Sequence, residues 1–90
     1  MPTIVVRHKV QDFATWKRAF DAHAPVRLTA GLSNARLFCS ADDANEVFVV
    51  LDAADIGKAK AFAASADVRE AMANAGVVDK PDIYFLNAVD

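Results

Sequence analysis

Four stretches of the chain tend to alternate apolar and polar residues, and the segments between them carry apolar residues at helical spacing. The alternating stretches are rich in β-branched and aromatic residues, which favour the half-buried surface of a sheet. The predicted strands are residues 3–10, 34–40, 46–52 and 83–89. A polar stretch at 41–45 separates the two middle strands and predicts a hairpin loop.

The first helical segment follows the first strand. Asp12 is a suitable N-cap, and the residues behind it form one apolar stripe along a helix. The stripe consists of Phe13, Trp16, Ala19, Phe20 and His23. Pro25 lacks a backbone N–H, so we expect it to break this helix or to restart it as a further turn, and Gly31 is a favourable stop.

A second helical segment lies between the third and fourth strands, in two pieces. Asp55 is the predicted cap of the first piece, residues 56–64. The second piece starts within residues 65–68, where Asp67 and Glu70 have the spacing of a capping box.

These elements follow the order β-α-β-β-α-β within a single domain, residues 1–90. This is the ferredoxin-like α+β arrangement. Right-handed crossovers place the strands in the order 4-1-3-2, antiparallel to their neighbours, with both helical segments on one face of the sheet.

The face of the predicted sheet away from the helices is also apolar. Its large apolar side chains are Val5, Phe38, Phe48, Val50, Tyr84 and Leu86. Burying a side chain of this kind is worth about 1.5–3 kcal/mol, and wide apolar patches mark interfaces. We therefore expect a second copy of the chain to cover this face in a two-fold homodimer. The alternative is a monomer in which some of these residues lie at the rim of the sheet.

Composition and charge exclude several classes of protein. The 90 residues, 54% of them hydrophobic, suffice for one core. No apolar run reaches the roughly 18 residues of a membrane span, and the N-terminus lacks the features of a signal peptide. The single cysteine, Cys39, cannot form an internal disulfide, which favours a cytoplasmic setting. A net charge of −2 gives no electrostatic reason for nucleic-acid binding.

A set of short motifs extends over nearly the whole chain. The motifs are His8-Lys9-Val10, Asp12-Phe13, Trp16-Lys17, Phe20-Asp21, His23, Arg27, Gly31, Arg69-Glu70-Ala71-Met72, Ala75-Gly76-Val77 and Pro81. In these motifs the chain resembles the dimeric α+β barrel superfamily, which includes small antibiotic-biosynthesis-monooxygenase-like and cyclase-like proteins. The resemblance implies a dimeric barrel of ferredoxin-like domains. Members oxidise aromatic polyketides, isomerise lactones or degrade haem, and others have no known reaction.

The haem-degrading branch of the superfamily does not fit this chain. Resemblance to that branch would require an Asn on the first strand, a Trp on the third strand and a His on the second helix. The first strand carries His8 and no Asn, residues 46–52 contain no Trp, and residues 55–75 contain no His.

Two histidines are candidates for acid–base chemistry, because imidazole ordinarily titrates near neutral pH. His8 lies in the row of the first strand that faces the helices, and His23 lies on the inward stripe of the first helix. Arg27 and Asn87 are candidates to hold a carbonyl or enolate oxygen. Each of these residues also has an alternative structural role. The alternative is a core position for His8, the end of a helix for His23, a surface ion pair for Arg27 and the end of a strand for Asn87.

A cavity between sheet and helices would suit a flat aromatic ligand. Its expected walls are Trp16, Phe20, Phe62, Met72 and Phe85, of which Trp16 and Phe20 are the candidate ligand-binding residues. The predicted topology places His23 near the opposite end of the sheet from His8, roughly 10–13 Å away at ~3.3 Å per strand residue. The sequence therefore leaves open whether the two histidines share one pocket.

The candidate residues indicate a cofactor-free monooxygenase or isomerase that acts on a small aromatic or enolisable substrate, with no metal. The alternative is a non-catalytic module for small-ligand binding or assembly on the same barrel. A third possibility is RNA binding on the outer face, where Phe48 and Tyr84 would stack on bases. The acidic charge balance opposes it.

Overall fold

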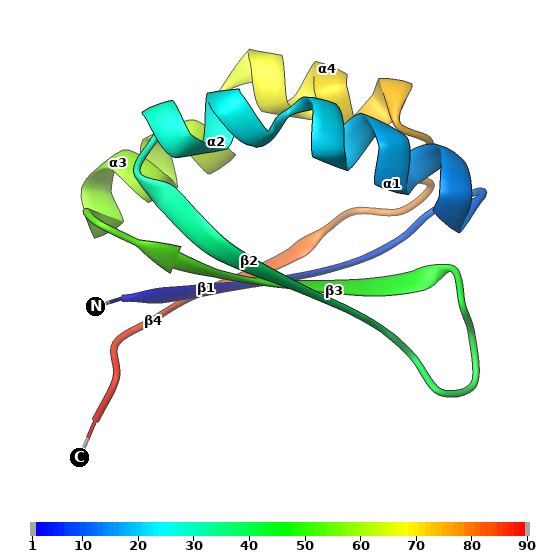
Figure 1. The fold of residues 1–90 in the computed structure, drawn as a ribbon, viewed down its shortest axis with the longest axis horizontal. Helices are drawn as coiled ribbons and strands as arrows, with labels where there is room; N and C mark the ends of the chain where they lie inside the picture. Colours follow the sequence, from blue (N-terminus) through cyan, green and yellow to red (C-terminus); the bar gives the residue numbers. More distant parts are fainter. Residues whose placement is uncertain (1, 90) are drawn as a thin grey trace.

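In the computed structural model, which describes residues 2–89, one antiparallel sheet carries a layer of helices on one face (Figure 1). The elements are β1 (Thr3–Lys9), α1 (Phe13–Ala22), α2 (Ala24–Thr29), β2 (Leu32–Cys39), β3 (Glu46–Ala53), α3 (Ile56–Ala63), α4 (Ala66–Asn74) and β4 (Asp82–Leu86). The strands lie in the order β2-β3-β1-β4. This order confirms the predicted ferredoxin-like α+β fold.

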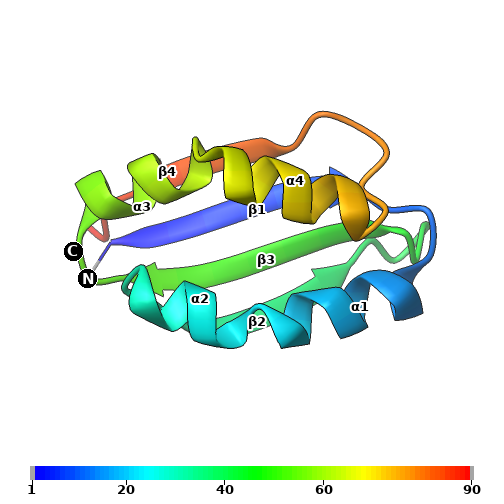
Figure 2. The same ribbon diagram turned by 90° about the horizontal axis from the view of Figure 1, so that it is seen from above.

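The helices form two lines above the sheet (Figure 2). Helices α1 and α2 run above β2 and β3, and α3 and α4 run above β1 and β4. The break between α1 and α2 falls at His23, whose backbone N–H donates to the carbonyls of Ala19 and Phe20. Pro25 lies in the first turn of α2, where a missing N–H removes no helical hydrogen bond. The proline therefore restarts the helix.

Side-chain caps set the starts of the other helices. The carboxylate of Asp12 accepts the backbone N–H of Thr15 at 3.0 Å, and that of Asp55 accepts the N–H of Lys58 at 3.0 Å. The start of α4 differs from the prediction. Its cap is Ser65, whose hydroxyl accepts the N–H of Val68, so the predicted capping box at Asp67 is wrong. Asp67 lies in the first turn, where its charge complements the helix dipole.

Strand β2 starts two residues earlier than predicted and contains a bulge. Its pairing with β3 shifts between Ser33 and Arg36, and Asn34 has a φ of 52°. A bulge inserts one unpaired residue and reverses the alternation of the strand. Leu32 and Leu37 can therefore both face the helices although they are five positions apart, a spacing that would place them on opposite faces of a regular strand.

The last strand is shorter than predicted. It ends at Leu86, which pairs with Thr3 of β1, and Asn87 lies outside the strand, exposed. The residue before Thr3 is Pro2, which has no N–H to donate to a ladder. The predicted placement of Asn87 in the inner row of β4 is therefore wrong.

The helices cover one face of the sheet and leave the side chains of the other face exposed. Inward side chains of β1 and β3, such as Val6 and Val49, are buried beneath the helices. Outward side chains are not covered: Phe38 is 52% exposed, Tyr84 53% and Leu86 46%. The core thus fills one side of the sheet only, and the predicted apolar outer face exists.

A charged cluster lies at one end of the outer face. Arg7 donates to Glu46 at 2.9 and 2.7 Å and to Asp79 at 3.0 Å. Asp79 also accepts the backbone N–H of Lys9 at 2.8 Å, and this bond lowers the pKa of its carboxyl group. These bonds tie the segment after α4 to β1, which helps to fix α4 over the sheet. In residues 2–89, none of the helices has the length and apolar character that crossing a bilayer would require.

Candidate ligand cavity

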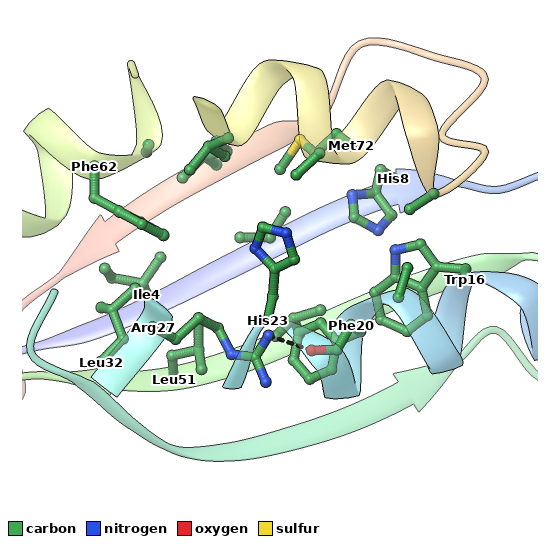
Figure 3. A pocket seen from close by; sticks show the side chains of 18 of the residues that line it. Ile4, His8, Trp16, Phe20, His23, Arg27, Leu32, Leu51, Phe62 and Met72 are labelled. Atoms are coloured by element: carbon green, nitrogen blue, oxygen red, sulfur yellow. Dashed lines mark hydrogen bonds between the residues drawn. The ribbon is translucent and has the colours of Figure 1, made fainter. Parts of the chain in front are cut away.

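A cavity of about 340 Å³ lies between the sheet and the two lines of helices (Figure 3). Its floor comes from inward side chains of β1 and β3, including Ile4, Val49 and Leu51. Trp16, Phe20, Phe62 and Met72 form walls, as predicted from the sequence. The volume is at the lower end of the range of small-molecule sites.

Alanines create much of this space. The helix residues that line the cavity include Ala19, Ala59, Ala63 and Ala71, and Ala75 lines it just after α4. A methyl side chain on an inward helix position leaves a gap that Leu or Phe would fill. The chain contains 19 alanines, and alanines on the inward stripe of a helix are the sequence signal of such a cavity.

His8 projects from β1 into the cavity and is 3% exposed. Neither Nδ1 nor Nε2 has a hydrogen-bond partner among the described residues. Its ring packs edge-on against Trp16, with centroids 5.5 Å apart. Burial lowers the pKa of His8, Asp79 raises it and Arg7 lowers it, with burial the largest effect. The imidazole is therefore neutral at physiological pH, with one nitrogen free to accept a proton.

Two aromatic rings from α1, those of Trp16 and Phe20, form one wall. Trp16 is 3% exposed and stacks on Phe20 at a centroid distance of 5.0 Å, and Phe13, outside the cavity lining, lies 5.8 Å from Trp16. Trp16 thus belongs both to the core and to the cavity wall. A flat ligand would meet aromatic faces and edges here.

Arg27 reaches the cavity from α2. Its Nη1 donates to the carbonyl of Phe20 at 2.6 Å, and its Cζ lies 3.6 Å from the centre of the Phe20 ring. Burial lowers the pKa of Arg27, and Asp21 raises it to a smaller extent. Within the described residues Arg27 forms no ion pair, so the surface salt bridge considered for it is not formed.

His23 lies in the same cavity, half-buried, between Arg27 and His8 (Figure 3). The structure therefore answers the question that the sequence left open: both histidines line one pocket. The cavity extends along the interface between helices and sheet, so residues from separate parts of α1 and β1 reach it.

Two predicted residues do not reach the cavity. Asn87 is exposed beyond the end of β4, and Phe85 packs against the core without lining the cavity. Instead Asn74, near the end of α4, adds a polar lining residue that the sequence analysis missed. Across residues 2–89 we find no group of three or more His, Cys, Asp or Glu side chains arranged to hold a metal ion.

No protein-family model and no curated protein sequence matches the chain. Solved structures match nearly its whole length. A candidate antibiotic biosynthesis monooxygenase from Bordetella bronchiseptica covers 98% of this chain and 96% of its own, with a TM-score of 0.80 and 18% identity. A second candidate, from Caulobacter crescentus, covers 99% and 90%, with a TM-score of 0.73 and 22% identity.

SnoaB, a cofactor-independent oxygenase from Streptomyces nogalater, covers 99% of this chain and 93% of its own, with a TM-score of 0.74 and 16% identity. At such identities the likeness establishes the fold. The chain has the fold of the antibiotic-biosynthesis-monooxygenase-like structures, which confirms at this level the resemblance seen in its motifs.

Proposed function

We propose that this protein is a cofactor-free monooxygenase or isomerase that binds a small aromatic or enolisable substrate in the cavity. The observation that carries the proposal is His8, which lines the cavity and whose two ring nitrogens are buried without a hydrogen-bond partner among residues 2–89. A buried polar group without a partner costs about 1–3 kcal/mol, and such a cost is typical of a functional position. The fold shared with a cofactor-independent oxygenase supports the same reaction class.

In this proposal the neutral imidazole of His8 removes a proton from a C–H or O–H of the substrate, and His23 is a second candidate for this role. The negative charge that develops on the substrate oxygen lies near the guanidinium of Arg27, which stabilises it. In an isomerase the proton returns to another carbon. In an oxygenase the electron-rich anion reacts with O2: a CH2 group becomes C=O, and the second oxygen atom leaves as water.

The first experiment tests turnover of a dihydroxyanthrone to the anthraquinone, followed by O2 consumption and product absorbance. We expect His8→Ala or His23→Ala to abolish most of the turnover. Arg18→Gln is the control, because Arg18 is exposed on α1 and does not line the cavity. Undiminished turnover in both histidine variants would remove the proposed base. The isomerase reaction is tested by exchange of deuterium from solvent into an enolisable ligand.

A non-catalytic ligand-binding or assembly module is the second candidate. It is favoured by the effect of burial on His8, because a lowered pKa makes the imidazole a weaker base. A binding protein should show a higher melting temperature with an aromatic ligand and no chemical change in that ligand. Product formation that depends on His8 would exclude this candidate.

We also propose that a second copy of the chain covers the outer face of the sheet. Phe38, Tyr84 and Leu86 are each about half exposed there, and none of the helices within residues 2–89 covers this face. Acidic side chains around Arg7 on the same face oppose RNA as the occupant. A cytoplasmic setting is part of the proposal, since Cys39 is an exposed free thiol.

Light scattering coupled to size-exclusion chromatography tests the homodimer. We expect a dimer at low micromolar concentration and a monomer for Leu86→Glu. Val89→Glu is the matched control, because Val89 is 91% exposed and lies beyond the last strand. A monomeric wild-type protein would rule out the homodimer.

A further inference from the structure

We propose that the cavity selects ligands that carry a carboxylate beside their apolar body, and that Arg27 is the residue that recognises this group. The inference rests on the proposed function and deepens it, because it names the chemical class of the ligand.

The charges around the cavity favour an anion. Among residues 2–89, the ionisable residues that line it are His8, His23 and Arg27, and no Asp or Glu does so. The acid nearest to Arg27 in sequence, Asp21, is already paired with Lys17 at 2.8 and 2.6 Å. Arg27 is thus the one lining residue with a permanent positive charge, and it has no carboxylate partner within residues 2–89.

The guanidinium of Arg27 is held in place by two contacts, and most of its N–H groups remain available to a ligand. Two contacts hold its plane: one with the Phe20 ring, and the bond from Nη1 to the Phe20 carbonyl, which is the dashed line in Figure 3. The remaining N–H groups donate to no protein acceptor among the described residues. A planar guanidinium matches the two oxygens of a carboxylate, and charge-assisted bonds of this bidentate kind are among the strong hydrogen bonds in proteins.

The position of Arg27 also limits the shape of the ligand. The backbone N–H of Arg27 donates to the carbonyl of His23 at 3.1 Å, so the two residues are one helical turn apart, about 6 Å along the axis. Figure 3 shows His23 between Arg27 and His8, with His8 on the Trp16 side of the cavity. The carboxylate should therefore lie a few bonds from the aromatic or enolisable centre, as in an arylpropanoate, rather than directly on it.

The test compares two probes of nearly equal shape, 3-phenylpropanoate and the neutral 3-phenylpropanamide, by isothermal titration calorimetry at neutral pH. Trp16 is the only tryptophan of the chain, so its emission reports whether a probe enters the cavity. We expect wild-type protein to bind the carboxylate at least about tenfold more tightly, the magnitude of one charge-assisted hydrogen bond.

Arg27→Gln should abolish this preference and leave amide binding intact, and Arg27→Lys should restore part of it. Arg18→Gln, which removes the same charge from the exposed side of α1, should retain the full preference. Equal affinities in wild-type protein, or a preference that survives in Arg27→Gln, would overturn the inference and leave the aromatic cavity standing. If neither probe bound or changed Trp16 emission, the inference and the proposed occupancy of the cavity would both be refuted.

Discussion

Replacement of His8 by phenylalanine should stabilise the protein while it abolishes turnover. The wild-type ring is 3% exposed and both nitrogens lack partners among the described residues. An unpaired buried polar group costs about 1–3 kcal/mol, and phenylalanine removes that cost. The larger ring ordinarily adds about 1–3 kcal/mol of strain in a packed core. Here the adjacent cavity of about 340 Å³ can take up the added volume.

The net expectation is a free energy of unfolding that rises by about 1–3 kcal/mol. For a domain of this size each kcal/mol shifts the melting temperature by about 4–8 °C, so the change is measurable by thermal and urea denaturation. Far-UV circular dichroism is the appropriate signal, because Trp16 contacts the mutated ring and its emission would change directly. Protein concentration is kept constant, since a dimer has concentration-dependent stability.

His23→Phe is the matched control for adding a phenyl ring to the same cavity. His23 is half-buried, so its imidazole retains contact with water and the gain should be smaller. If His8→Phe lowered the free energy of unfolding, the reasoning would be refuted. The imidazole would then be satisfied, for example by bound water, and His8 would be a structural residue.

The remaining predictions concern pH, the backbone and the cavity. Since the pKa of His8 is lowered in the folded protein, stability should be complete above the unfolded value of about 6.5 and fall as pH drops from there toward the folded value. The urea midpoint of His8→Phe should not show this fall with pH. Midpoints of wild-type protein and His8→Phe that fell in parallel would contradict the prediction. Gly31→Ala should destabilise by about 1–3 kcal/mol in urea denaturation, because Gly31 has a φ of +81°, a backbone conformation that a residue with a Cβ adopts only with strain. An unchanged urea midpoint would mean that the turn relaxes at no cost. Ala71→Leu should fill part of the cavity and weaken 3-phenylpropanoate binding by about tenfold or more in calorimetry. Full affinity would place the ligand elsewhere.

Local rules account for what the sequence predicted correctly. Side chains along residues 3–9 and 46–53 point alternately to the two faces of the sheet. As this alternation predicts, every second residue of β1 and β3 is buried. The caps at Asp12 and Asp55 act through residues three positions further on, so they are readable from spacing alone. Right-handed connections then leave few ways to order the strands, and the predicted order is the observed one.

Long-range pairing decided what the sequence could not. The last strand ends at Leu86 because its neighbour, β1, begins at Thr3, which is far away along the chain. Asn87 therefore lies beyond the sheet and outside the site. The meeting of His8, His23 and Arg27 in one cavity is likewise a tertiary result. It depends on the path of α1 and α2 over the sheet and on alanines of α3 and α4 that leave space opposite them. Periodicity shows which side of an element is inward, but only packing decides which inward residues share a space and whether that space is filled.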